Sequence, residues 1–107
     1  MSAVFIHRLR VTYADCTLGN HVYYGRYLDF LEATRGEFFR QLGRTFLQWR
    51  EAGAIFPVLE VQVRYRGAAR YEAETHHVCT NLSDKPQRLP QDLISALAPY
   101  RRSAAAA

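Results

Sequence analysis

The feature that most constrains this chain is a long amphipathic stretch that runs from Tyr23 to Leu42. Large side chains recur in it at steps of three and four residues, which is the period of an α-helix with one buried face. These positions are Tyr24, Tyr27, Leu28, Leu31, Arg35, Phe38, Phe39 and Leu42, all apolar or aromatic except Arg35. Gly43 follows them and is well placed to end the helix. A helix of about 18–20 residues has to be the central packing element of a 107-residue chain.

Three other segments have the two-residue period of β-strands. Residues 4–13 carry β-branched and aromatic side chains with imperfect alternation, which predicts a strand before the helix. Residues 56–66 alternate strictly, which is typical of a half-buried antiparallel strand. One of its faces holds Val61, Val63 and Tyr65, and the other holds Glu60, Gln62, Arg64 and Arg66. Residues 71–81 predict a further strand, although charged residues and histidines weaken the pattern.

Shorter elements complete the pattern. Residues 45–52, which begin with a threonine suited to an N-cap, predict a short helix, residues 67–69 a turn, and residues 90–97 a C-terminal helix. Residues 1–100 are expected to form a single domain, followed by a disordered tail at 101–107. The order strand, long helix, strand, strand predicts an α+β fold in which an antiparallel sheet wraps around one long central helix.

Aromatic and basic residues dominate the composition. Seven Tyr, six Phe and one Trp are more than the modest core of a small domain holds, so some rings are expected at a subunit interface or in a pocket. The net charge is +4, which is compatible with nucleic acid, with the phosphates of a nucleotide-bearing cofactor, or with a solvated arginine-rich surface. Because acidic residues are interspersed with the arginines, nucleic acid is not the expected partner.

No segment predicts a membrane span or secretion. No apolar run approaches the ~20 residues of a membrane helix, and the N-terminus lacks a signal-peptide pattern. Cys16 and Cys79 are too few for a disulfide scaffold and have no metal-ligand spacing. A cytoplasmic protein with reduced thiols and no membrane partner is therefore expected.

Two segments carry a resemblance to a known family. The stretch Val11–Phe39 (VTYADCTLGNHVYYGRYLDFLEATRGEFF) has a strand that ends in Asp15, a tight loop with glycine, and an Arg-Tyr-Leu step into the long helix. It resembles the opening of the 4-hydroxybenzoyl-CoA thioesterase family of hotdog proteins. The stretch Phe56–Glu74 resembles the same family's next strand and its turn into a third.

The resemblance implies a hotdog fold and an activity. Proteins of this family hydrolyse acyl-CoA or acyl-carrier-protein thioesters without a metal or organic cofactor. They work as homodimers or homotetramers in which the acyl group lies between subunits. A non-catalytic hotdog module that binds acyl-CoA or a protein partner is the alternative.

The chain departs from the family's pattern at three places. Enzymes of the family commonly have a second acid two residues after Asp15, where this chain has Thr17. Some relatives have a histidine where this chain has Tyr24. After Glu74 the chain passes directly into a segment that resembles the family's final strand, so that a hairpin is missing. Such a deletion would leave the sheet with an unpaired edge.

Thioester hydrolysis needs donors for the carbonyl oxygen and a group that activates water or attacks the acyl carbon. The first-turn amides around Tyr23, Tyr24 and Gly25 have no acceptor within a helix, and the helix dipole adds partial positive charge there. These amides are candidates to polarise a thioester oxygen. Alternatively, Asn20 or water simply caps them.

The candidates for the second role are Asp15, His21 and Glu32. Asp15 could instead stabilise its loop, His21 could form a local hydrogen bond, and Glu32 could be a solvated helix residue. Thr17 is too weak an acid to act as a base but could position water or the carbonyl. The residues expected to take part in catalysis are therefore Asp15, Thr17, His21, Tyr24 and Glu32.

Aromatic and basic side chains are the candidates for substrate contacts. The rings from Tyr23 to Phe30 could line an acyl pocket or could be plain core. Arg64 and Arg66 could hold phosphates or could form a solvated strand face. The adjacent histidines 76 and 77 point to opposite faces of a strand and cannot chelate one ion together. The residues expected to bind the substrate are therefore Asn20, Tyr23, Gly25, Tyr27, Arg64 and Arg66.

Overall fold

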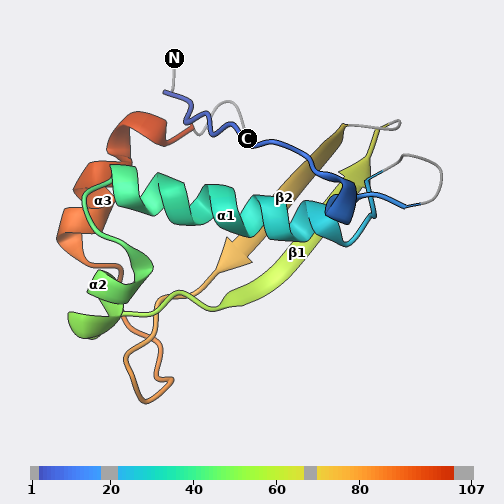
Figure 1. The fold of residues 1–107 in the computed structure, drawn as a ribbon. Coiled ribbons are helices and arrows are strands. Elements are labelled where there is room, and N and C mark those ends of the chain that lie inside the picture. Colours follow the sequence, from blue (N-terminus) through green and yellow to red (C-terminus); the bar gives the residue numbers. More distant parts are fainter. Residues whose placement is uncertain (1–2, 18–21, 67–69, 103–107) are drawn as a thin grey trace.

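A computed structural model describes residues 3–17, 22–66 and 70–102 of the chain. Its helices are α1 (Arg26–Gln41), α2 (Phe46–Glu51) and α3 (Gln91–Leu97), and its strands are β1 (Val58–Tyr65) and β2 (Tyr71–His77). Two short 3-10 helices lie at Tyr13–Asp15 and Ala98–Tyr100. The antiparallel hairpin crosses α1 on one side, and α2 and α3 gather at the helix's C-terminal end (Figure 1). The expected α+β arrangement of a sheet around one long helix is confirmed. Of the helices described, none has the length and apolar character to cross a bilayer.

Helix α1 begins three residues later than its amphipathic pattern predicts. Gly25 is the N-cap, and the two residues before Arg26 form a turn instead of a first helical turn. At the other end Gly43 has a φ of +115°, a left-handed conformation that favours glycine and ends the helix as expected. The buried residues of α1 are Tyr27 and Phe39, which belong to the predicted apolar face.

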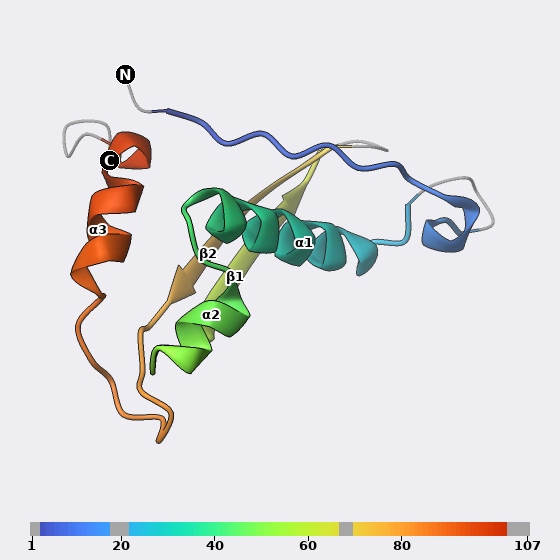
Figure 2. The same ribbon diagram turned by 60° about the vertical axis from the view of Figure 1, so that its left-hand side comes forward.

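The core lies at the C-terminal end of α1. Its buried residues are Phe39, Trp49, Ala54, Cys79 and Leu93, and five partly buried apolar side chains pack against them. Figure 2 shows α3 standing beside this end of α1, with α2 below it. Helix α2 is held by a capping box, in which Thr45 accepts from Gln48 N–H at 3.2 Å while the Gln48 side chain accepts from Thr45 N–H at 2.8 Å. The predicted short helix and its cap are therefore confirmed.

The two strands form a hairpin of which α1 covers only part. Tyr65 lies opposite Tyr71, and Tyr27 of α1 packs against both rings at centroid distances of 5.4 and 4.6 Å. The alternation along β1 then puts Arg64 on the opposite face, away from α1. Val61 on the inner face remains 41% exposed. The expectation of a half-buried strand is therefore met only in part, because α1 reaches the hairpin mainly through Tyr27.

The expected N-terminal strand at 4–13 is wrong as a strand. Residues 3–12 are extended, but no ladder joins them to any other described residue. They are held at their start, where Ala3 N–H donates to Pro99 O at 2.7 Å and the ring of Phe5 lies 5.2 Å from that of Phe38. An extended segment becomes a strand only when it pairs with another strand, and none of the described residues pairs with this segment.

The predicted strand at 71–81 is shorter than expected. It ends at His77, after which Thr80 forms isolated bridges with Ile55 and Pro86. The predicted C-terminal helix is confirmed as α3, which starts directly after Pro90. The turn expected at 67–69 lies outside the described residues.

Candidate active site

A closed loop brings Asp15 to the start of α1. Cys16 and Val22 form an antiparallel bridge, and the N–H of Tyr23 donates to the carbonyl of Asp15 at 2.8 Å. These contacts join the 3-10 turn before the loop to the turn that leads into Arg26. Asp15 therefore lies beside the start of α1.

Asp15 is held by a dense set of contacts. Its Oδ2 accepts from the backbone N–H of Thr12 at 2.9 Å and from the Thr12 hydroxyl at 3.2 Å. Its Oδ1 lies 3.2 Å from Nε of Arg26, and only 14% of the Asp15 side chain is exposed. These contacts fix the orientation of the carboxylate beside the start of α1. They also stabilise the turn that contains Asp15, which is the alternative role that the sequence left open for this residue.

Arg26 is a member of this site that sequence reasoning missed. Besides Asp15, its guanidinium reaches Asp29 at 3.2 Å and the carbonyl of Ala14 at 3.3 Å. It thereby ties the 3-10 turn to the first turn of α1. The three-residue spacing in the helix predicts the ion pair between Arg26 and Asp29. No local sequence pattern predicts the ion pair between Arg26 and Asp15.

Two backbone amides directly before α1 have no acceptor among the described residues. No side chain caps the helix at Gly25, and the N–H groups of Arg26 and Leu28 bond to carbonyls of the preceding turn. Within the described parts of the chain, the amides of Tyr24 and Gly25 have no acceptor. A Cβ at Gly25 would lie 2.9 Å from a ring carbon of Tyr23, so glycine leaves room there for the Tyr23 ring.

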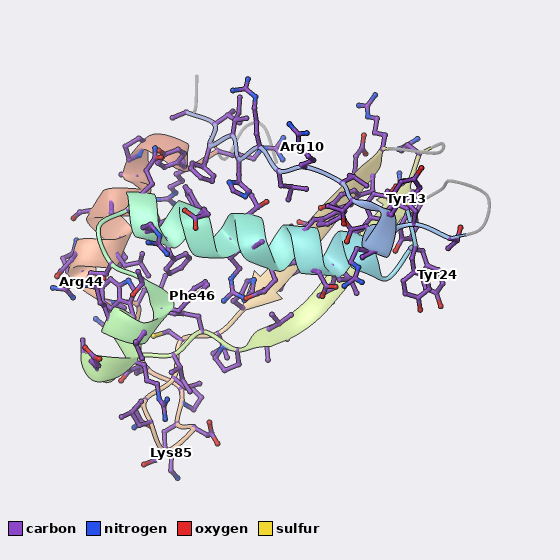
Figure 3. All side chains as sticks on the ribbon, in the orientation of Figure 1. Arg10, Tyr13, Tyr24, Arg44, Phe46 and Lys85 are labelled. Carbon is purple, nitrogen blue, oxygen red and sulfur yellow. The ribbon has the colours of Figure 1, made fainter. Side chains whose placement is uncertain are left out.

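Two tyrosines flank these amides. The rings of Tyr23 and Tyr24 are 4.8 Å apart, and both side chains are exposed. Tyr24 projects outward at the start of α1, at the same end of the molecule as Tyr13 (Figure 3). A hydrogen bond between the two hydroxyls raises the pKa of Tyr23, and the repulsion between their charges adds to it. The carbonyl of Tyr24 accepts from the hydroxyl of Tyr65 at 2.9 Å, which fastens the helix start to β1.

Other predicted site residues lie elsewhere. Tyr27 is only 7% exposed and packs in the aromatic cluster between α1 and the hairpin. Arg64 and Arg66 lie on the hairpin face that points away from α1, where Arg66 pairs with Glu72 at 3.5 Å. The structure therefore does not bring these three residues together with the exposed amides. Thr17 is exposed and close to Asp15 along the chain, whereas Asn20 and His21 lie outside the described residues.

Glu32 lies farther along α1, in a hollow of its own. It lies six positions after Arg26, which corresponds to about 9 Å along a helix. It pairs with Arg35 at 3.2 Å and lines a hollow of about 670 Å³ together with Phe46 and Phe56. Glu32 and Asp15 are therefore not neighbours in this subunit. No group of three or more His, Cys, Asp or Glu residues that suits a metal ion occurs in the part of the chain that the structure describes.

His77, which contacts Phe56 of this hollow, is expected to make the stability of the fold depend on pH. Nδ1 of His77 lies 3.3 Å from the carbonyl of Phe56, and Nε2 lies 2.9 Å from the hydroxyl of Thr75. A neutral ring that donates from Nδ1 and accepts at Nε2 satisfies both contacts. Burial lowers the pKa of His77 from 6.5, and the charge of Arg35 lowers it further.

The expected result is a loss of stability in acid. The unfolded chain binds a proton at His77 more readily than the folded chain, so stability falls as the pH drops through 6.5 and towards the lowered folded pKa. A His77→Gln variant lacks this contribution to the pH dependence of stability. Urea unfolding at pH 7 and pH 5 should therefore show a smaller drop in the free energy of unfolding for the variant. Equal drops in both proteins would contradict the assignment.

The comparisons with known proteins agree with this architecture. The sequence model of the thioesterase superfamily matches residues 19–80. A search of curated proteins gave no match. Among solved structures, the chain is similar to a hypothetical protein of Thermus thermophilus, with a TM-score of 0.74 and 23% identity over 87% of this chain and 96% of the other.

Two further structures are similar to the chain. The DHNA-CoA thioesterase of Staphylococcus aureus has a TM-score of 0.71 and 20% identity over 84% of this chain and 85% of its own. The 1,4-dihydroxy-2-naphthoyl-CoA thioesterase of Synechocystis has a TM-score of 0.74 and 17% identity over 84% of this chain and 92% of its own. These likenesses and the family match confirm the hotdog fold.

Proposed function

Because the chain belongs to the thioesterase superfamily, we propose that it hydrolyses a thioester that joins an acyl or aryl group to coenzyme A or to an acyl carrier protein. The observation that supports this reaction most is that a fixed carboxylate lies near two backbone amides, directly before α1, that have no acceptor among the described residues. Asp15 lies beside the start of α1, and the amides of Tyr24 and Gly25 there lack acceptors among the described residues.

In this proposal, the start of α1 polarises the thioester carbonyl. A thioester oxygen placed at the amides of Tyr24 and Gly25 would be polarised by two donors and by the dipole of α1. As water attacks the acyl carbon, negative charge develops on this oxygen and the same donors stabilise it. The bond between carbon and sulfur then breaks, so the products are a carboxylic acid and a free thiol.

We assign the proton transfer of this reaction to Asp15. A carboxylate accepts the proton that water loses during attack and returns it to the departing thiolate. The contacts with Thr12 and Arg26 orient Asp15 for this task, and Thr17 close by offers a hydroxyl that positions the water. We also assign His21 and Asn20, which lie between Thr17 and Tyr23 in the sequence, to the proposed catalytic site.

The chemical surroundings favour an aromatic acyl group. Tyr23 and Tyr24 present exposed rings next to the proposed oxyanion site, and flat rings stack on such surfaces. Of the similar structures, one is named as a DHNA-CoA thioesterase and another as a 1,4-dihydroxy-2-naphthoyl-CoA thioesterase. Aryl-CoA thioesters are therefore the first substrates to test, ahead of straight-chain acyl-CoA.

The chain is also proposed to act as a homodimer or homotetramer in the cytoplasm. Large apolar side chains are exposed along the N-terminal segment, the hairpin and α3, more than one soluble subunit needs. Both described cysteines are free thiols, as a reducing compartment maintains them.

A thiol-release assay tests the activity. The purified protein is mixed with aryl-CoA, short acyl-CoA, long acyl-CoA and acyl-carrier-protein thioesters, and free thiol is followed with a thiol-reactive dye. We expect saturable release above the uncatalysed rate, with aryl-CoA fastest. Absence of release across the panel would overturn the proposed reaction.

The residue at position 17 favours one alternative, a module that binds acyl-CoA without hydrolysis. Thr17 occupies the position at which enzymes of the family commonly have an acid, and threonine is too weak an acid to serve as a base. Calorimetric binding of acyl-CoA that is not followed by thiol release would decide for this alternative.

Thr17→Asp is expected to increase hydrolysis. Thr17 is exposed in the structure, so the new carboxylate fits without repacking and can take a proton from water. We expect kcat/KM for the best thioester to rise about tenfold or more. The control is Thr17→Asn, which adds similar bulk without a base. Equal rates for both variants would show that position 17 does not contact the reacting water.

A further inference from the structure

The hydroxyl of Tyr65 contacts a peptide group that belongs to the candidate site. Tyr65 is the last residue of β1, and its hydroxyl donates to the carbonyl of Tyr24 at 2.9 Å. The carbonyl of Tyr24 and the N–H of Gly25 are the two ends of one planar peptide unit. In a trans peptide these groups point in opposite directions. The bond from Tyr65 therefore also fixes the direction in which the Gly25 N–H points.

The carbonyl of Tyr24 does not receive the backbone donor that a regular helix would supply. In a regular α-helix it would accept from the N–H of Leu28, four residues further along. Leu28 N–H instead donates to the carbonyl of Gly25 at 3.2 Å, and Gly25 is the N-cap of α1. A side chain of β1 therefore takes the place of this backbone donor.

The ring of Tyr65 holds its hydroxyl in place. This ring lies 5.4 Å from that of Tyr27, edge to face, and Tyr27 is only 7% exposed. Tyr71, which lies opposite Tyr65 in the ladder, packs against Tyr27 at 4.6 Å. Because the ring is packed, the hydroxyl has its position before any substrate binds, which is the condition for a preorganised donor.

We propose that Tyr65 is a positioning residue for the thioester hydrolysis proposed above, because it orients and polarises the N–H of Gly25. A hydrogen bond to a peptide carbonyl draws electron density towards its oxygen, so the N–H of the same peptide becomes a stronger donor. In the proposed reaction this N–H stabilises the thioester oxygen as negative charge develops on it. Tyr65 acts through the peptide between Tyr24 and Gly25 and does not touch the substrate. The inference rests on the proposed function.

Removal of one hydroxyl tests this role. Tyr65→Phe keeps the packed ring and leaves the Gly25 donor in place, but the donor loses its polarising bond. Loss of a whole oxyanion donor typically costs about 10²–10³-fold in kcat, so we expect a fall of about tenfold, with KM changed less than about twofold.

The control is Tyr71→Phe. Tyr71 packs on the same ring of Tyr27, but its hydroxyl has no hydrogen-bond partner among the described residues. This variant should keep kcat within about twofold of the parent. Circular dichroism verifies that both variants are folded. If Tyr65→Phe, while folded, has the same kcat as Tyr71→Phe, the proposal is wrong.

A tether between β1 and α1 is the competing role for the same hydrogen bond, and a graded change separates the two. Fluorine on the ring of Tyr65 makes the phenol more acidic and therefore a stronger donor, with little change in size. At a pH that keeps this phenol protonated, a fluorotyrosine at position 65 should raise kcat above that of the parent. A tether predicts no such increase, so an unchanged kcat would count against the positioning role.

The amide nitrogen of Gly25 reports the same bond without any substrate. A donor on the preceding carbonyl deshields this nitrogen, so its magnetic resonance signal should move upfield in Tyr65→Phe and stay in place in Tyr71→Phe. Because the signal needs no turnover, it separates two failures. A parent protein that releases no thiol from any thioester overturns the hydrolysis, whereas an unmoved Gly25 signal in Tyr65→Phe overturns the role of Tyr65.

Discussion

Replacing Phe39 by alanine is expected to lower the free energy of unfolding by about 3–5 kcal/mol. Phe39 is 9% exposed, and its ring lies 4.5 Å from that of Phe46 and 5.4 Å from that of Phe56. It is also the buried residue that α1 contributes to the cluster around Trp49 and Leu93. A small domain has about 5–15 kcal/mol of stability in total, so this one change should remove much of it.

Chemical denaturation followed by tryptophan fluorescence measures the effect, because Trp49 belongs to the same cluster. The control is Leu28→Ala on the same helix, where the side chain is 44% exposed and the expected loss is below about 1.5 kcal/mol. Similar losses for both variants would mean that the core does not lie at the C-terminal end of α1.

Local chemistry makes the helices and most of their ends predictable, although α1 begins three residues later than its pattern predicts. The period of the apolar residues located α1, and Gly43 ended it because a left-handed residue there is cheap only for glycine. Thr45 marked the start of α2 because its side chain accepts from the backbone three residues on. Such signals act within one or two turns of chain, so one sequence suffices to read them.

Pairing between distant segments was not predictable in the same way. The pattern of residues 4–13 describes a segment that is able to form a strand, but the strand exists only where another edge meets it. β2 illustrates the same limit, because its pattern ran to residue 81 while its ladder ends at His77. Tertiary context decides these cases and is absent from a local pattern.

The sequence names candidate residues for the site but not their partners in space. Asp15 is a candidate because of its residue type and its place in the loop, whereas its ion pair with Arg26 depends on how the loop closes. Tyr27 has the same helical period as its exposed aromatic neighbours, so periodicity could not separate a core ring from a substrate contact. Glu32 is a candidate because it is a carboxylate on the long helix, but it pairs with Arg35 and lines a hollow that does not include Asp15.

Asp15→Asn is expected to lower kcat for the best thioester substrate by about 10²–10⁴-fold, the contribution typical of a positioned acid or base. Asparagine keeps the shape of the side chain and can still accept from Thr12, so the turn before the loop should survive. It cannot take a proton from water, which is the step assigned to Asp15. Thiol release under saturating substrate measures kcat, and substrate binding should change little because the amides of Tyr24 and Gly25 remain in place.

Two further variants separate this role from a structural one. Arg26→Gln removes the ion pair with Asp15 but leaves the carboxylate, so it should lower stability while retaining more activity than Asp15→Asn. Glu32→Gln changes a carboxylate of the same subunit that lies outside the proposed site and should keep kcat within about threefold of the parent. If Asp15→Asn remains active while folded and Glu32→Gln does not, the reacting carboxylate is Glu32. Catalysis would then belong to the hollow beside Arg35 and not to the start of α1.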